Sequence, residues 1–166
     1  MKTVQYLVMF FTFLLLLNAC SKDAEPEAPS CSQTENISMK INGDEKQFEI
    51  QGWGISLDND GTGHTLELLI VSGVYYPSQD SYAISIELPY KKTGDNIIEE
   101  FNYFRVKDTT SARGDFDPGN LQSSVYINSN TCISLSFSGT AIIDGKEIII
   151  SEGVIEHVYR EAFEDQ

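Results

Sequence analysis

The chain contains few cysteines, histidines and basic residues, and each shortage excludes a class of partner or site. Its 166 residues include 3 Cys, 2 His and 1 Trp, and 11 Lys and Arg stand against 25 Asp and Glu. The formal net charge of −14 repels nucleic acid and anionic lipid, and we exclude nucleic acid as a partner on this ground. Neither His64 nor His157 has a second His or a Cys at ligand spacing, which argues against a zinc site.

Catalytic sequence motifs are also missing. The sequence contains no Gly-x-Ser-x-Gly nucleophile elbow and no glycine-rich phosphate loop. Carboxylates are abundant, but nothing in their pattern selects two of them as a glycosidase pair. We therefore expect a non-catalytic protein without a cofactor, and a small hydrolase stands last among the alternatives.

Long hydrophobic runs are absent except at the N-terminus. Val4 to Leu17 is almost continuously apolar and Lys2 is the only charge before Cys20, which is the form of a secretory signal. The run is shorter than the ~20 apolar residues of a spanning helix. Leu17-Asn18-Ala19-Cys20 resembles the lipobox of bacterial lipoproteins. The resemblance implies cleavage before Cys20 and lipid attachment to it, and two or more acyl chains hold a protein stably in a membrane.

The residues after Cys20 indicate which way the anchored protein faces. Ser21-Lys22-Asp23-Ala24-Glu25 resembles the lysine-plus-acidic export signal of Bacteroidota lipoproteins. The resemblance implies an outer-membrane lipoprotein that is surface-exposed rather than periplasmic. We expect a signal peptide at 1–19, a lipidated flexible tether at 20–35, one domain at 36–160 and a charged tail at 161–166.

Two cysteines remain once Cys20 is assigned to lipid. An even pair in an exported chain predicts a disulfide between Cys31 and Cys132. Closing a loop of about 100 residues contributes on the order of 4–5 kcal/mol in the chain-entropy model. Cys132 has the parity of Ser134 and Ser136, so we expect the disulfide to lie away from the core, joining the start of the domain to the outside of a sheet.

The domain shows the alternation of β-strands and no sustained 3.6-residue period. Eight or nine short runs separated by Gly, Asn, Asp and Pro predict an all-β fold, an antiparallel β-sandwich. A jelly-roll and an Ig-like topology both stay open. The runs lie at 36–41, 48–51, 65–71, 82–88, 104–107, 125–127, 133–138, 146–151 and 154–159.

Three segments carry more specific predictions. Asn42-Gly43-Asp44 is typical of a hairpin turn whose second arm reaches Gln51. Thr65 to Val71 is nearly all apolar, which favours a central strand buried on both faces. Asn96 to Tyr103 could hold one helical turn.

The C-terminal strands resemble those of a group of small Bacteroidota cell-envelope lipoproteins of unknown function. The resemblance rests on Ile133 to Ala141, Asp144-Gly145-Lys146 and Ile148 to Ile155, and on the opening Met39-Lys40-Ile41-Asn42-Gly43 with Phe48. It implies an anchored β-sandwich and brings no catalytic residue with it.

Aromatic residues supply the first candidate binding site. Trp53, Tyr75 and Tyr76 could stack on sugar rings, because flat aromatic faces bury the apolar CH groups of a sugar. The alternative is that these aromatics fill the core, as aromatics in strands do. If these aromatics prove buried, the glycan-binding hypothesis fails.

Three short motifs supply further candidates. Asp58 and Asp60 suggest a calcium loop, but the position of the bidentate Glu is Leu69, so a polar turn is the better interpretation. Thr109 lies in a sequence that resembles the O-glycosylation acceptor of Bacteroidota secreted proteins. Arg113-Gly114-Asp115 matches the integrin tripeptide, but Gly and Asp are expected in a loop for turn reasons alone.

Together these observations predict a non-catalytic, lipid-anchored protein of the cell envelope. Its leading function is a surface module that binds a glycan or a protein partner. The alternative is a purely structural or assembly lipoprotein. A binder should present exposed aromatics, and an assembly protein a contiguous apolar patch or an open strand edge.

Overall fold

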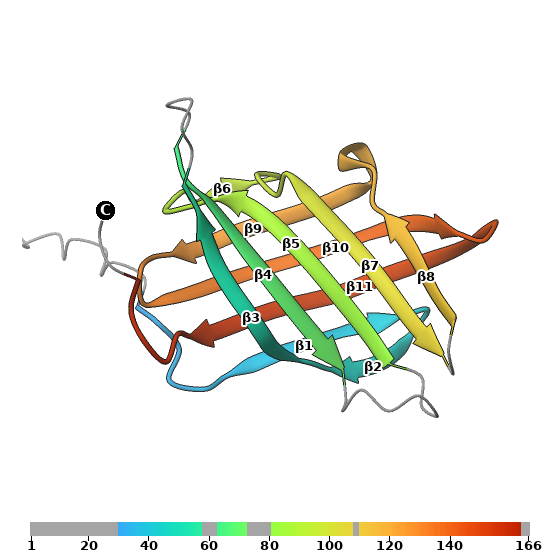
Figure 1. Ribbon diagram of the computed structural model, residues 1–166, viewed down its shortest axis with the longest axis horizontal. Coiled ribbons are helices and arrows are strands. Elements are labelled where there is room, and N and C mark those ends of the chain that lie inside the picture. The colour runs from blue at the N-terminus through green and yellow to red at the C-terminus, as the bar shows by residue number, and fades with distance from the viewer. Residues whose placement is uncertain (1–29, 58–62, 73–80, 108–109, 164–166) are drawn as a thin grey trace, which may run out of the picture.

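The computed structural model describes residues 30–57, 63–72, 81–107 and 110–163. Over these ranges two antiparallel sheets of six and five strands face each other (Figure 1), which confirms the all-β sandwich. The strands are β1 (Asn36–Ile41), β2 (Asp44–Gln47), β3 (Glu49–Ser56), β4 (Thr65–Ser72), β5 (Ser81–Pro89), β6 (Gly94–Asp95), β7 (Glu100–Lys107), β8 (Thr110–Asp115), β9 (Leu121–Asn128), β10 (Cys132–Ile143) and β11 (Lys146–Val158).

The strand order resolves the topology that the sequence left open. The six-stranded sheet runs β2-β1-β11-β10-β9-β6 and the five-stranded sheet β3-β4-β5-β7-β8. Most neighbours are consecutive along the chain, and the β1–β11 pair joins the two ends of the domain. Jelly-roll and Ig-like folds contain Greek-key connections. The described sheets consist mainly of strands paired with their neighbours in the chain, and the exceptions are the β1–β11, β9–β6 and β5–β7 pairs.

The strands are more numerous than predicted because three of them are short or polar. β2 has four residues and β6 two, and β8 reads Thr-Ser-Ala-Arg-Gly-Asp without an apolar alternation. In the opposite sense, the two runs predicted at 146–151 and 154–159 form the single strand β11. Its pairing with β1 and β10 shifts in register around Glu152, whose φ of 52° marks an irregularity that looks like a turn in the sequence.

The first hairpin forms as predicted but ends sooner. Asn42 and Gly43 have φ values of 51° and 89°, the left-handed pair that a tight hairpin turn requires. Pairing with β1 stops at Gln47, so the prediction that the second arm reaches Gln51 is wrong. Phe48 donates its N–H to the carbonyl oxygen of Ile37 at 2.8 Å, and the chain then crosses into the other sheet as β3.

The core lies between the two sheets, and most of the longer strands bury one face. On β4, Leu66, Leu68 and Ile70 are at most 1 % exposed, whereas Leu69 is 42 % exposed. The prediction that this strand is buried on both faces is therefore wrong, because no further layer covers the outside of its sheet among the described residues. The helical turn expected over Asn96 to Tyr103 is also wrong, since this segment leads directly into β7.

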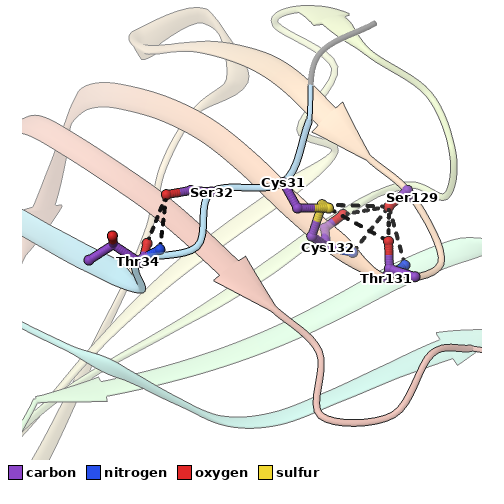
Figure 2. Close-up of a disulfide and its surroundings, with 6 residues drawn as sticks. All are labelled: Cys31, Ser32, Thr34, Ser129, Thr131 and Cys132. Atoms are coloured by element: carbon purple, nitrogen blue, oxygen red, sulfur yellow. Dashed lines mark hydrogen bonds between the residues drawn. A yellow bond between two sulfur atoms is a disulfide. The ribbon is translucent and has the colours of Figure 1, made fainter.

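The predicted disulfide between Cys31 and Cys132 is present, with 5.9 Å between the Cα atoms (Figure 2). Cys132 is only 1 % exposed, so the expectation that it lies on the outside of the sheet with Ser134 and Ser136 is wrong, although it is separate from the main cluster of core side chains. Next to it, the Ser129 hydroxyl accepts the N–H groups of Thr131 and Cys132 at 3.2 and 3.1 Å. The bond therefore fastens the chain before β1 to the start of β10, outside the main core.

Both ends of the described chain are held by further contacts. The Glu35 carboxylate lies 2.7 Å from Nδ1 of His157 on β11. Phe163 donates its N–H to the carbonyl oxygen of Asn130 at 2.8 Å and stacks edge-on against Tyr159. Contacts with the domain thus begin before residue 36 and continue past residue 160.

Candidate functional site

A hollow of about 560 Å³ lies across β6, β9, β10 and β11 of the six-stranded sheet. In Figure 1 β9, β10 and β11 lie behind the five-stranded sheet. Serines that alternate with the core residues of β10 line the hollow, so it opens on the side away from the core. Most of the side chains along it are hydroxyl, amide or carboxylate groups. The lining residues are Asp95, Asn96, Gln122, Ser123, Ser124, Ser136, Phe137, Ser138, Glu152, Gly153 and Val154.

The floor of the hollow follows from the alternation of β10. Leu135 and Phe137 point into the core, so the serines between and beside them point outward. The register aligns Ser136 with Ser124 on one side and with Val154 on the other. Because the side chains of these residues are short, the middle of the sheet face lies lower than its surroundings.

One wall is formed by the chain at β6. Asp95 pairs with Ser124 across the β6–β9 ladder. The following Asn96 closes the edge of the sheet, since its N–H donates to the carbonyl oxygen of Ser123 at 2.8 Å and its Oδ1 accepts the N–H of Ser123 at 3.0 Å. A polar loop therefore covers what would otherwise be an open strand edge.

The opposite wall is formed by Glu152 on β11. Its Oε1 accepts a charge-assisted hydrogen bond from Nζ of Lys40 on β1 at 2.6 Å, although its side chain is 68 % exposed. Glu152 and Asn96 both have left-handed φ values, 52° and 54°, outside the hairpin turns in which Asn42 and Asp144 adopt the same conformation. Such conformations cost about 1–3 kcal/mol each and concentrate at functional sites.

Hydrogen bonds between side chains organise the polar groups of the hollow. The Ser124 hydroxyl donates to Oδ1 of Asp95 at 2.6 Å. The Tyr126 hydroxyl and the Ser136 hydroxyl lie 2.9 Å apart. Tyr126 is 55 % exposed, so it presents an aromatic ring beside a surface of donors and acceptors. This combination suits a ligand that carries many hydroxyl groups on an apolar ring.

Trp53, one of the three predicted sugar-stacking residues, does not lie at this hollow. It is half-buried on β3 and packs against the core, with its ring centroid 5.9 Å from that of His157 and 6.0 Å from that of Tyr159. Trp53 therefore belongs to an aromatic cluster at one end of the sandwich rather than to an exposed loop. The other two, Tyr75 and Tyr76, lie outside the described residues.

The aromatic cluster of Trp53, His157 and Tyr159 contains buried polar atoms that form no hydrogen bond in the described chain. Within the described chain, Nε2 of His157 and the Tyr159 hydroxyl are buried without a hydrogen-bond partner. Burial, and secondly the neighbouring Tyr90, raise the pKa of Tyr159 far above its ordinary value, so the phenol stays protonated. We assign the cluster a packing role, because its rings pack on one another and against the core.

The remaining predicted sites divide into two groups. Cys20, Asp58, Asp60 and Thr109 lie outside the described residues. The Arg113-Gly114-Asp115 tripeptide was expected in a loop, and that expectation is wrong: it belongs to β8 and pairs with β7. A Cβ at Gly114 would collide with the Ile143 side chain, so packing favours a glycine here.

Two further absences hold for the described residues. Within them, no group of three or more His, Cys, Asp or Glu side chains is arranged to hold a metal ion. The same residues include no helix of the length and apolarity needed to cross a membrane.

Sequence reasoning missed the hollow, although part of its signal was visible. The alternation that identified β10 also places Ser134, Ser136 and Ser138 on one outer face. A row of small hydroxyl residues on a strand marks a possible depression, but it requires knowledge of the neighbouring strands. Comparisons with protein-family models, with curated proteins and with solved structures find no match.

Proposed function

We propose that the protein is a non-catalytic, lipid-anchored module of the outer cell envelope whose hollow binds a glycan. The observation that carries the binding proposal is the serine-floored depression across β6, β9, β10 and β11, with the exposed Tyr126 ring bonded to Ser136 beside it. Sugars offer hydroxyl groups and apolar CH faces together, and this surface offers a partner for each.

The size and the openness of the hollow to solvent also fit this class of ligand. A volume of about 560 Å³ is within the range of small-molecule sites. Its lining is richer in hydroxyl and carboxylate groups than in apolar ones, which disfavours a lipid or a hydrophobic cofactor. Ordered water commonly completes the contacts in such polar sites at little energetic cost.

The binding experiment is a thermal-shift scan of the protein against neutral oligosaccharides. A ligand that binds only the folded state stabilises it by about 2.7 kcal/mol at 100 times its dissociation constant, which raises the melting temperature. We expect a reproducible rise with one glycan class. A flat response across all classes would remove the glycan proposal.

A matched pair of variants locates the binding to the hollow. Ser136→Phe fills the floor on β10, whereas Ser85→Phe makes the same change on the outer face of β5, where Ser85 is equally half-buried. We expect the first variant to lose the ligand-induced shift and the second to keep it. Equal loss in both variants would mean that the hollow is not the binding site.

The anchor is tested at Cys20, on which the lipidation proposal depends. Cys20→Ser removes the thiol that accepts the lipid, so the variant should leave the membrane fraction and appear in the soluble fraction. Membrane association that survives this change would overturn the anchoring proposal and leave the binding proposal intact.

A second candidate function is contact with a protein partner at the far end of the β10–β11 hairpin. Ile142 is 72 % exposed and Ile149 is 44 % exposed, and the register places them diagonally across the two strands. A pair of exposed isoleucines is a small apolar surface, so we rank it below the hollow. Ile142→Asp would abolish such a contact, as judged by cross-linking on cells, without altering glycan binding.

A further inference from the structure

We infer that the hollow selects uncharged or cationic glycans, such as neutral and amino sugars, and rejects glycans that carry carboxylates or sulfates. This inference rests on the proposed glycan-binding function and adds to it the charge class of the ligand. It follows from three features of the ionisable side chains that line the hollow: the sign of their charge, the different extent to which neighbouring groups compensate that charge, and their positions along the hollow.

The charges that line the hollow are of one sign. Asp95 and Glu152 are the ionisable residues among the lining side chains of the described chain, and no Lys or Arg stands with them. An anionic ligand would meet two carboxylates, and the Lys40 ammonium beside them already pairs with Glu152. Specific sites commonly exclude wrong ligands by such unpaired like charges.

The two carboxylates differ in how far their charge is compensated. Lys40 reaches Glu152 from β1 with 2.6 Å between Nζ and Oε1. Asp95 accepts a hydroxyl hydrogen bond from Ser124 at 2.6 Å and has no salt bridge among the described residues. Asp95 therefore carries the uncompensated charge of the site, and we assign it as the main determinant of the charge preference.

Both carboxylates keep capacity for a ligand. An ionised carboxylate offers about four acceptor positions, and each of these two uses one position in the bonds just described. The remaining positions can accept sugar hydroxyl groups or pair with a ligand ammonium. Either group forms a charge-assisted hydrogen bond with the carboxylate, but an ammonium adds a charge–charge attraction that a hydroxyl lacks, so it gains more at Asp95.

The positions of the two groups indicate how a glycan lies. Asp95 is on β6 and Glu152 on β11, which are separated by β9 and β10. Three strand spacings amount to about 14 Å, the span of an oligosaccharide rather than of one sugar. A chain laid across the strands would have one end near Asp95 and the other near Glu152, with the serine row beneath its middle.

The test compares three hexamers of the same β-1,4-linked backbone by calorimetric titration: chitosan oligomer, cellohexaose and cellouronate oligomer. The titrations use mildly acidic buffer, in which the amino groups of chitosan are charged. We expect chitosan to bind about tenfold more tightly than cellohexaose, and cellouronate at least about tenfold more weakly. Added salt should weaken chitosan binding and leave cellohexaose binding unchanged.

Two isosteric variants separate the roles of the carboxylates. Asp95→Asn should reduce the difference between chitosan and cellohexaose to less than about threefold, whereas Glu152→Gln should keep most of it because Lys40 already offsets that charge. Cellouronate binding as tightly as cellohexaose would overturn the inference. So would the absence of binding by all three hexamers, and the wider neutral panel then decides separately whether glycan binding itself stands.

Discussion

The two outer faces of the sandwich are built from the same alternation but carry opposite chemistry. On the six-stranded sheet, Ser124 and Ser136 stand opposite each other and a polar hollow opens above them. On the five-stranded sheet, Glu67, Glu87 and Glu100 stand opposite one another on β4, β5 and β7. One outer face exposes hydroxyl groups, and the other concentrates carboxylates whose mutual repulsion across the strands lowers the stability of the folded state.

The two sheets differ equally in their regularity. The register shifts in the β1–β11, β10–β11 and β9–β10 pairs, all in the six-stranded sheet. In the five-stranded sheet, among described residues, it shifts only between β3 and β4. Bulges bend strands and re-aim side chains, and they are common next to binding sites. The irregular sheet is therefore the one that carries the hollow, and the regular sheet closes the core behind it.

Removing the disulfide should have the largest effect on this arrangement. The bond between Cys31 and Cys132 closes a loop with a sequence separation of 101. Replacing both cysteines with Ala should lower the free energy of unfolding by about 2–4 kcal/mol, mainly because the unfolded chain gains freedom. Chemical denaturation of the protein and its double variant measures the difference.

A reducing agent provides the control for that change. It should destabilise the wild type by a similar amount and leave the double Ala variant unaffected, because the variant has no bond between these positions to reduce. A loss below about 0.5 kcal/mol in the double variant would mean that the unfolded state is already compact and the crosslink constrains it little.

A pair of glycines compares the packing beneath the two faces. A Cβ at Gly153 on β11 would come within 2.5–2.7 Å of the Phe137 ring, whereas a Cβ at Gly54 on β3 would meet nothing within 4 Å. Gly153→Ala should cost about 1–3 kcal/mol through overpacking. Gly54→Ala should be neutral or stabilise by up to about 1 kcal/mol, because Ala restricts the unfolded chain.

Thermal unfolding of both glycine variants measures this contrast. Gly153→Ala should also weaken glycan binding, since displacing the Phe137 ring disturbs the strand that carries Ser136. Equal melting temperatures for the two variants would show that the Phe137 ring moves aside freely and that the hollow does not depend on tight packing below it.

The sequence was sufficient to predict the sandwich and the disulfide, because both depend on local or pairwise signals. Alternation at 133–138 places Leu135 and Phe137 in the core, and the structure has them there. Once Cys20 is assigned to lipid, Cys31 and Cys132 are the only cysteines left to pair with each other. The sequence misled where the burial of a strand depends on which elements cover it. The apolar run of β4 predicted burial on both faces, but nothing in the described chain covers its outer face.

The candidate site was out of reach for a different physical reason. It depends on the two-residue strand β6 pairing with β9, and on a bulge at Glu152 that resembles a turn in the sequence. Neither feature has a period that a sequence window can detect. The aromatic residues predicted a different site, because the sequence does not distinguish a Trp53 ring that packs on His157 from one that faces solvent.

The smallest predicted effect tests the charged face directly. Burial, and then the carboxylates of Glu100, Glu67 and Glu99, raise the pKa of Glu87 above its ordinary value of 4.5. Glu87→Gln removes the repulsion across the strands and should stabilise the protein at neutral pH by about 0.2–1 kcal/mol. Glu156→Gln is the matched control on the six-stranded sheet, where its cross-strand neighbours Asn36 and Ser134 are uncharged, and it should change little.

The pH dependence of the Glu87 effect fixes its cause. A carboxyl whose pKa is raised by folding holds its proton more tightly in the folded state than in the unfolded state. Its contribution to stability is therefore largest below pH 4.5 and declines as the pH rises through the raised folded value. Wild type and Glu87→Gln should converge at acid pH and separate towards neutrality, as measured by chemical denaturation across that range. A constant difference at every pH would mean that the gain comes from packing rather than from relief of like charges.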